Sequence, residues 1–353
     1  MVSTLHDVAR VAGVSIKTVS NVVNDYPHVS TATRDRVLSA IAELDYRPNL
    51  SARGLRSGKT GVIGLAIPEL RQNYFAELAD SIIRAASRYK LDVVIDQTSA
   101  TREGEVAVLS GKRLRLTDGI IFAPERLGQE DIHLLEVGFP LILLGERMFG
   151  GPTDHVTMHN VESARAGTEH LIGIGRRRIA VIGAHPDHPD DIRSANLRIQ
   201  GYREALEAAG LPYDPDLVRV AAPWHRENGA AAMRGLLEDG VSFDAVFTLN
   251  DTLGLGALRA LGEAGVRVPA DVAVLGFDNI DESRFSVPSL SSVEPGRDEI
   301  AQVAVDLLVE RIKEKGERQP PRQFLADYRI VGRESTGFTE PVLPADAIGP
   351  LPE

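Results

Sequence analysis

Several polar side chains follow apolar runs of this sequence at positions where ligands are commonly bound. Arg198, Asn250 and Asp278 do so in the second half of the chain, together with Trp224, its one tryptophan. Arg, Asn and Asp can make directional hydrogen bonds to hydroxyl groups, and an aromatic ring can cover the apolar C–H face of a polyol. The set predicts a sugar site, with a nucleoside or purine as the alternative ligand. Arg198 and Asp278 could instead form a structural ion pair, and Trp224 could be an ordinary core or surface residue.

The first half of the chain offers a second group at the same kind of position. Tyr74 and Phe75 follow the first predicted strand, Gln97 ends the second, and Arg147 follows the fourth. We expect these four to share the ligand with the previous group, because ligands of parallel α/β domains meet the carboxyl ends of strands. Tyr74 and Phe75 could equally be core residues. The other strand-end candidates are Pro68, Glu69, Ala123, Pro124, Glu125 and Glu146.

A different chemistry is indicated near the N-terminus. Ala9, Gly13 and Val19 are spaced as in two short helices that cross through a tight turn, in which Gly13 takes a positive φ. In the second of these helices Ile16, Lys17 and Asn21 project away from the apolar Val19 side. Lys can donate to guanine, Asn can pair with adenine, and Ile can touch a thymine methyl group. The pattern predicts a helix-turn-helix that reads DNA, although it would also fit a helical hairpin with solvated side chains.

Other chemistries receive little support. The sequence has no cysteine, which excludes disulfides and thiolate sites. It has no G-x-S-x-G, H-E-x-x-H or Walker A motif, so we predict no catalytic residue and no cofactor. His185, Asp187, His188, Asp190 and Asp191 form a dense cluster. Two prolines and the irregular spacing favour a solvated loop over a metal site.

The charge distribution is compatible with DNA binding at one end of the chain. The net charge is −11 over 353 residues, yet residues 1–59 hold eight Lys and Arg against five Asp and Glu. A basic head on an acidic body favours DNA contact by the head alone. There is no signal peptide and no membrane-length apolar run, so we predict a cytoplasmic protein with no membrane contact.

The chain from residue 60 onward, which we call the body, is predicted to form two α/β lobes in tandem. Apolar strand-like runs at 61–67, 91–97, 118–123 and 140–145 alternate with helical stretches at 73–90, 102–114 and 130–137. The alternation resumes with strands at 178–184, 218–222, 244–249 and 272–277 between helices at 161–174, 198–209, 226–239 and 252–264. Such a pattern is typical of doubly wound parallel sheets. Residues 291–316 and 323–332 would cross back, adding a helix to the first lobe and a strand to the second. The result is a periplasmic-binding-protein-like architecture with ligand in the cleft between the lobes.

The head should contain three helices and be followed by a short fourth. Thr4 and Ser30 are suited to cap the first and third helices, and Ser15 can open the second. Val37, Leu38, Ile41 and Leu44 fall at helical spacing and would close the core of the head. Pro48 ends the third helix, and a marginal helix could follow over 50–56.

These segments together resemble the LacI/GalR family of bacterial transcription regulators. The resemblance rests on TLHDVARVAGVSIKTVSNVVN, YRPNLSARGL, RIQGYREAL, TLNDTLGLGALRAL and GVRVPADVAVLGFDN, and it extends to about Thr336. One departure is His159-Asn160 at the crossover between lobes, where the family usually has Asp-Asn. The resemblance implies that Ile16, Lys17 and Asn21 read bases and that Arg198, Asn250, Asp278 and Trp224 contact the effector.

The resemblance also implies a set of DNA contacts that carry no sequence information. A hinge helix over 50–56 would order on DNA, with Leu55 as a minor-groove wedge and Arg53 along phosphates. Ser15, at the start of the recognition helix, is also a predicted DNA-binding residue. The phosphate-contacting positions are Thr4, Thr18, Ser20, Asn24, Ser30, Thr33, Tyr46 and Asn49.

The domain plan follows from these segments. We predict a helix-turn-helix domain over 1–46, a hinge over 47–59, an effector and dimerisation domain over 60–336, and a disordered tail over 337–353. The first lobe would take 60–160 and 291–321, and the second 161–290 and 322–336. No C-terminal leucine heptad is present, so a homodimer is expected. The predicted function is a transcriptional repressor that binds a pseudo-palindromic operator in double-stranded DNA. A small molecule, expected to be a sugar, would change its affinity for the operator. The alternative is a regulator that needs a nucleoside or purine as co-repressor. No motif in the sequence supports an enzyme, and the predicted DNA-binding head argues against a transport binding protein.

Overall fold

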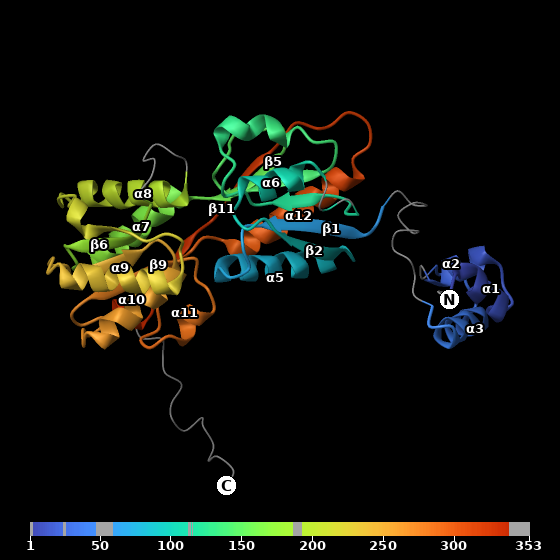
Figure 1. The fold of residues 1–353 in the computed structure, drawn as a ribbon, viewed down its shortest axis with the longest axis horizontal. Helices are drawn as coiled ribbons and strands as arrows, with labels where there is room; N and C mark the ends of the chain where they lie inside the picture. The colour runs from blue at the N-terminus through green and yellow to red at the C-terminus, as the bar shows by residue number, and fades with distance from the viewer. Residues whose placement is uncertain are drawn as a thin grey trace, which may run out of the picture. The chain divides into compact units, whose positions relative to one another are not determined.

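The computed structural model describes residues 3–23, 26–46, 59–111, 114, 116–185 and 193–338. The chain divides into two compact units, residues 1–61 and 62–353, which we describe separately. The second unit contains two lobes, each built on its own sheet (Figure 1). Within the described residues, every helix is too short or too polar to cross a membrane.

The first unit is a three-helix head with a small apolar core. Its helices are α1 (Leu5–Ala12), α2 (Ile16–Val23) and α3 (Thr31–Glu43). Thr4 forms a capping box with Asp7, and Gly13 ends α1 with a φ of 64°. Val8, Val19 and Val37 are fully buried between the helices. The predicted caps and turn are therefore confirmed.

One part of the expected head core is wrong. Leu38 is 50% exposed, and Tyr46 is buried in the core at 8% exposure. Val37 and Ala40 already fill the inner face of α3, so the neighbouring Leu38 turns outward. The chain after α3 returns across the core and places Tyr46 there, which helical spacing within α3 does not reveal.

The first lobe is a six-stranded parallel sheet with helices on both faces. Its strand order is β11-β5-β4-β3-β1-β2, and all its pairings are parallel. The strands are β1 (Val62–Ile67), β2 (Asp92–Gln97), β3 (Ile120–Phe122), β4 (Leu141–Leu144), β5 (Asp154–Met158) and β11 (Gln323–Ala326). Helices α5 (Asn73–Ser87) and α12 (Arg297–Lys313) cover one face, and α6 (Arg102–Leu109) with the 3-10 helix η1 (Gln129–Leu135) covers the other.

The second lobe repeats this plan. Its strand order is β12-β10-β9-β8-β6-β7, with β12 antiparallel to β10. The strands are β6 (Ile179–Ala184), β7 (Val218–Val220), β8 (Ala245–Thr248), β9 (Ala273–Phe277), β10 (Ser291–Glu294) and β12 (Arg329–Val331). Helices α7 (Asn160–Gly173) and α8 (Ser194–Ala208) pack on one face, and α9 (Arg226–Glu238) and α10 (Asp251–Glu263) on the other (Figure 1). Short helices α11 (Glu282–Phe285), η2 (Pro215–Leu217) and η3 (Glu334–Thr336) complete it.

The predicted fold class is confirmed, but the crossings between lobes differ from the expected ones. Residues 291–294 form β10 and pair with β9 in the second sheet, whereas 323–326 form β11 and pair with β5 in the first. The chain thus crosses three times, after β5, after β10 and after β11. Strands β5 and β10 are rich in buried polar residues, such as Asp154, His155, Ser291 and Ser292. Neither reads as an apolar run, so the sequence did not reveal them as strands.

A buried ion pair ties β5, α12 and the start of β11 together within the first lobe. Both oxygens of Asp154, which starts β5, accept from the guanidinium of Arg311 on α12, at 2.7 and 2.8 Å. Arg322, just before β11, adds a contact at 3.2 Å from its side chain and one at 2.8 Å from its backbone N–H. Burial raises the pKa of Asp154, but the hydrogen bonds from Arg311 and Arg322 outweigh it and keep this pKa below its ordinary value.

We predict that Arg311→Met lowers the free energy of unfolding of the second unit by about 3–5 kcal/mol, because Asp154 is left buried without its main partner. The control Arg322→Met should cost about 1 kcal/mol or less, because that side chain is 47% exposed. Urea unfolding at neutral and acid pH measures both. Since the folded pKa of Asp154 is lowered, the stabilisation is present at neutral pH and is lost as the pH falls through that pKa. Equal losses for the two variants would contradict this assignment.

Candidate ligand cleft and DNA-binding head

A cleft opens between the two lobes at the carboxyl ends of their strands. The empty space within it is about 1070 Å³, counted out to its mouth and including open solvent. Both lobes contribute to its walls. The lining includes Tyr74, Phe75, Glu125, Glu146, Arg147, Met158, His185, Arg193, Ser194, Arg198, Trp224, Asn250 and Asp278.

Arg198 is the central group of the second-lobe wall. It lies on α8 and is only 4% exposed. Its Nε donates to Asn160 Oδ1 at 2.9 Å, and Nη1 donates to the backbone carbonyl of Leu249. The guanidinium carbon lies 3.5 Å from the ring centroid of Phe277 and 5.5 Å from that of Trp224. Burial lowers the pKa of Arg198, and the nearby carboxylate of Asp278 opposes this shift.

Asp278 faces Arg198 from the end of β9. Its Oδ1 lies 3.8 Å from Arg198 Nη1, so the ion pair considered from the sequence is present within one lobe. Burial raises the pKa of Asp278 well above its ordinary value, against the attraction of Arg198. The backbone φ is 107° at Asp278 and 50° at Asn279, a conformation that L-residues rarely adopt.

The segment after β9 is held in this conformation by buried hydrogen bonds. Asn279 donates to Glu294 at 2.7 Å and accepts from Arg333 at 2.6 Å. The carboxylate of Asp251, at the start of α10, accepts from the backbone N–H of Ile280 at 3.0 Å. These contacts hold the backbone that follows Asp278 at the cleft wall.

Trp224 and Asn250 complete this wall. Trp224 Nε1 donates to the carbonyl of Gly183 at 2.9 Å, which fixes the plane of the ring. Asn250 caps α10 by accepting from the N–H of Leu253 at 2.8 Å. Its amide nitrogen therefore remains as the donor for a ligand. With Arg198 and Asp278, this wall presents donors, an acceptor and a ring, which suits a polyol.

The first lobe brings three of its four predicted residues to the cleft. Tyr74 and Phe75 stand edge to face, with ring centroids 5.3 Å apart, and burial raises the pKa of the Tyr74 hydroxyl. Arg147 is buried and donates to the carbonyl of Leu127 at 3.2 Å. Gln97 does not line the cleft: it is exposed, and its side-chain oxygen accepts from the N–H of Leu70 at 3.1 Å. Strand β2 is the edge strand of its sheet, and its end lies away from the cleft.

Of the other strand-end candidates, Ala123, Pro124, Glu125 and Glu146 line the cleft, and further lining residues were not foreseen. Glu146 accepts from Ser194 of the second lobe and, at 3.5 Å, from Asn160 Nδ2. Glu125 and Glu146 follow β3 and β4, so their strand-end positions were the available signal. Met158 ends β5, a strand that the sequence did not reveal, and Arg193 and Ser194 carried no signal. Residues 186–192, which contain most of the His-Asp cluster, lie outside the described part of the chain.

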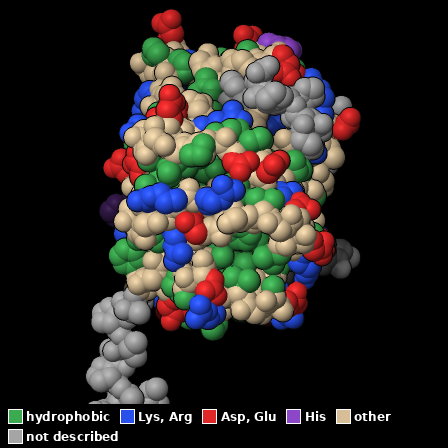
Figure 2. Space-filling view, turned by 90° about the vertical axis from the view of Figure 1, so that its left-hand side faces the viewer, with side chains coloured by type: hydrophobic (Ala, Val, Ile, Leu, Met, Phe, Trp, Pro, Cys, Tyr) green, Lys and Arg blue, Asp and Glu red, His purple; other side chains and the backbone are tan. Residues whose placement is uncertain are grey.

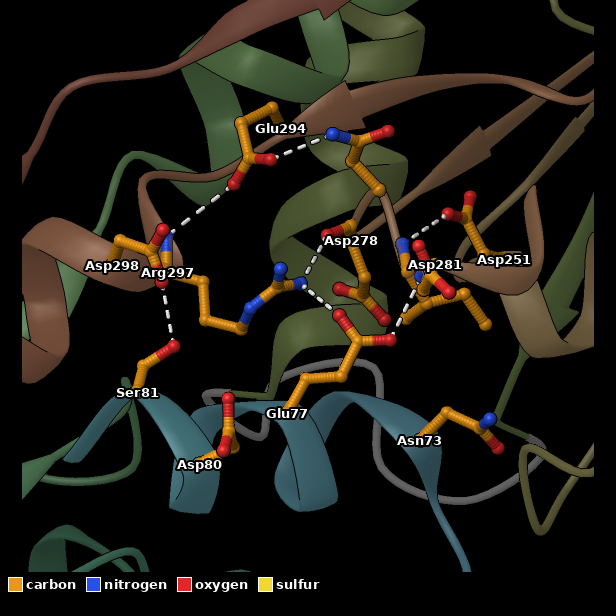
Figure 3. A network of polar contacts seen from close by, with 12 residues as sticks. Asn73, Glu77, Asp80, Ser81, Asp251, Asp278, Asp281, Glu294, Arg297 and Asp298 are labelled. Carbon is orange, nitrogen blue, oxygen red and sulfur yellow. Dashed lines mark hydrogen bonds and ion pairs between the residues drawn. The ribbon is translucent and has the colours of Figure 1, made fainter. Parts of the chain in front are cut away.

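Polar contacts also join the lobes at the rim of the cleft. Glu69 of the first lobe lies 2.8 Å from His225 Nε2 of the second. Glu77 on α5 lies between Arg297, at 2.9 Å, and the backbone N–H of Asp281, at 2.8 Å (Figure 3). Arg297 also donates to the carbonyl of Asp278 at 3.3 Å. The rim is therefore linked to the segment that carries Asp278.

In the head, α2 presents the predicted base-reading residues. Lys17 is exposed, Asn21 is half-buried, and Ile16 packs partly against the core of the head. Ser15 Oγ accepts from the N–H of Thr18 at 3.1 Å and so caps α2. Ser30 caps α3 in the same way through Thr33. Thr4 caps α1 and Ser20 is half-buried on α2, while Tyr46 belongs to the core. Asn24, Asn49, Arg53 and Leu55 lie outside the described residues.

Comparisons with known proteins cover both units. Residues 4–49 match the family described as bacterial regulatory proteins, lacI family, and residues 168–336 match the periplasmic binding protein-like domain. The chain is 33% identical to catabolite control protein A of Priestia megaterium, over 94% of this chain and 99% of that protein. It is 35% identical to the HTH-type transcriptional regulator CelR of Thermobifida fusca, over 94% of this chain and 98% of that protein.

Solved structures of similar proteins show the same fold. A putative LacI-family transcriptional regulator from Sanguibacter keddieii is 50% identical, with a TM-score of 0.72 over 79% of this chain and 99% of that one. A CelR–cellobiose complex is 32% identical, with a TM-score of 0.66 over 94% and 99%. The Lac repressor dimer bound to operator and the anti-inducer ONPF is 27% identical, with a TM-score of 0.78 over 95% and 99%.

We predict that Arg198→Met makes the second unit less stable, and more so at pH 8 than at pH 5. The variant leaves the carboxylate of Asp278 buried without its main cationic partner, with only the weaker attraction of Arg297, at a cost of about 3 kcal/mol. This raises the folded pKa of Asp278 further, so the group gains a proton on folding and stability falls as the pH rises through that pKa. Urea unfolding of wild type and variant at both pH values measures the difference.

The double variant Arg198→Met/Asp278→Asn is the control, because it has no carboxyl group to titrate at this position. Its stability should not show the added pH dependence, although it lacks the same guanidinium as the single variant. An Arg198→Met variant whose stability loss is the same at pH 5 and pH 8 would show that Asp278 is not its electrostatic partner.

Proposed function

Because the chain belongs to the LacI family of bacterial regulatory proteins, we propose that this DNA-binding transcriptional regulator is a dimeric repressor whose operator affinity falls when a sugar occupies the cleft. The observation that carries the proposal is the wall formed by Arg198, Trp224, Asn250 and Asp278. Its donors, acceptor and ring are fixed by contacts within the protein itself. Such preorganisation lowers the cost of binding a hydroxylated ligand.

The relatives support a sugar as the effector class. A similar protein has been solved as a CelR–cellobiose complex, and another relative is named the ribose operon repressor of Escherichia coli. The nucleoside alternative is not favoured by these comparisons. For this chain, the choice of a sugar rests on the cleft wall described above, because Trp224 can cover C–H groups while Asp278 and Asn250 bind hydroxyls.

DNA recognition is assigned to α2. We propose that Lys17 and Asn21 contact base edges in the major groove, with Ile16 beside a thymine methyl group. Two heads of a dimer would then read the two halves of a pseudo-palindrome. The Lac repressor has been solved as a dimer bound to operator, which supports this arrangement. On the face of the body shown in Figure 2, acidic and basic side chains are intermixed, as expected if phosphate contacts belong to the head. We assign the protein to the cytoplasm, where the operator is.

The test begins with a thermal-shift screen of the whole protein. The panel contains glucose, galactose, ribose, cellobiose and maltose, the amino sugars glucosamine and galactosamine, the phosphates glucose 6-phosphate and ribose 5-phosphate, and adenosine and guanine. A ligand that binds the folded state raises the melting temperature by mass action. We expect at least one sugar to do so and to change the fluorescence of Trp224, the one tryptophan of the chain.

The second step selects DNA from random duplexes with and without each stabilising compound. We expect a palindromic sequence whose affinity for the protein drops about 5- to 150-fold in the presence of the sugar, the usual size of allosteric coupling. Tighter binding with adenosine or guanine would instead support a co-repressor. Selection of no palindrome under any condition would refute the assignment of the head.

A further inference from the structure

Glu125 is a carboxylate of the cleft wall with an unmet hydrogen-bonding requirement. It follows β3 and lines the cleft in the first lobe. Its Oε2 is buried and has no hydrogen-bond partner among the described residues. A buried carboxylate oxygen without a donor is costly, and at a binding site it points to a ligand that supplies one.

The loop that carries Glu125 is held rigidly from behind. Glu105 on α6 is fully buried, and its carboxylate accepts from three successive backbone N–H groups. The donors are Glu125 at 2.8 Å, Arg126 at 3.0 Å and Leu127 at 2.7 Å. On its carbonyl side the loop accepts from Arg147, whose Nε donates to Leu127 O at 3.2 Å. The backbone of Glu125 is thus fixed by groups unrelated to any ligand.

Within the described part of the chain, no charged side chain donates to the Oε2 of Glu125. Arg126 is exposed, and its Nε donates to the carbonyl of Ala100 at 2.8 Å. Burial raises the pKa of Glu125, the nearby Arg126 opposes this shift, and the carboxylates of Glu105, Glu69 and Glu146 raise the pKa further.

The neighbouring carboxylates have partners of their own. Glu69 is bound by His225 and, at 3.1 Å, by Gln72, and Glu146 is bound by Ser194 and Asn160. Among the carboxylates near this wall, Glu125 is the one with a buried oxygen left over. The surroundings of this oxygen therefore favour a ligand group that donates a hydrogen bond and disfavour an anionic ligand group.

We propose that Glu125 determines specificity by accepting hydrogen bonds from the effector, so that the site takes a sugar with hydroxyl or ammonium groups at the first-lobe end and rejects one with a phosphate there. The inference rests on the proposed function and adds the charge class of the effector. Arg198 and Asp278 hold the other end of the ligand in the second lobe. Glu125 would then give the two ends of the cleft different chemistries.

The test measures binding of the compounds of the thermal-shift panel by calorimetry to wild type and to Glu125→Gln. The substitution keeps the size of the side chain and replaces an acceptor oxygen by an NH2 donor. Affinity for the uncharged or amino sugars that bind wild type should fall about tenfold or more. Comparison of glucose with glucosamine separates a hydroxyl from an ammonium donor, because the loss should be greater for the cation.

Two further readouts separate a ligand contact from a structural role. Glu125→Gln without ligand should be as stable as wild type or more stable, because it removes a buried and unpartnered charge. Wild type should bind glucose 6-phosphate and ribose 5-phosphate at least tenfold more weakly than glucose and ribose, and Glu125→Gln should narrow that gap. Glu136→Gln is the matched control: it is the same substitution at an exposed position after η1, and it should leave all affinities unchanged.

The outcomes distinguish this inference from the proposed function. If sugars bind wild type but Glu125→Gln binds them equally well, or if phosphorylated sugars bind wild type as tightly as uncharged ones, the role of Glu125 is refuted and the repressor function stands. If no sugar on the panel binds wild type, the proposed sugar effector fails, and the role of Glu125 fails with it.

Discussion

The binding wall of the second lobe depends on the burial of one cation, Arg198. A guanidinium with 4% exposure is tolerated only when its charge and its donors are satisfied. The ends of β8 and β9 supply the carbonyl of Leu249, the ring of Phe277 and the carboxylate of Asp278, and the start of α7 supplies Asn160. Meeting these requirements also builds the site, because the same groups form a fixed, polar and partly desolvated surface for hydroxyls.

Closure of the lobes is balanced by weak contacts. The rim contacts of Arg71 with Glu227 and of Arg226 with Asn73 are largely exposed, and each contributes little free energy. A ligand that touches Glu146 or Tyr74 on one side and Arg198 on the other adds interactions available only in the closed arrangement. A modest differential affinity can therefore shift the equilibrium between lobe positions. The strained backbone at Asp278 lies where this shift would be sensed.

Much of this architecture could be predicted from the sequence. Apolar runs gave β1, β4, β6 and β9, and strand ends pointed to most of the cleft residues. The failures share a cause: β5 and β10 are buried strands whose polar side chains are satisfied by distant partners, for example Asp154 by Arg311 and Ser292 by Asp251. No local pattern encodes such partners. Gln97 was misplaced for a related reason, since strand order decides which strand ends reach the cleft, and order is a property of the whole sheet.

Energetic coupling between the cleft and the head requires that the binding of sugar and the binding of operator affect each other reciprocally. Calorimetry of the strongest-binding sugar on the free protein and on the protein saturated with its selected palindrome gives two sugar affinities. Operator titrations with and without the sugar give two DNA affinities. We expect the ratio of the two sugar affinities to equal the ratio of the two DNA affinities and to differ from one, as linkage requires. A sugar that binds free and DNA-bound protein with the same affinity would contradict it, because the cleft would then have no influence on the head.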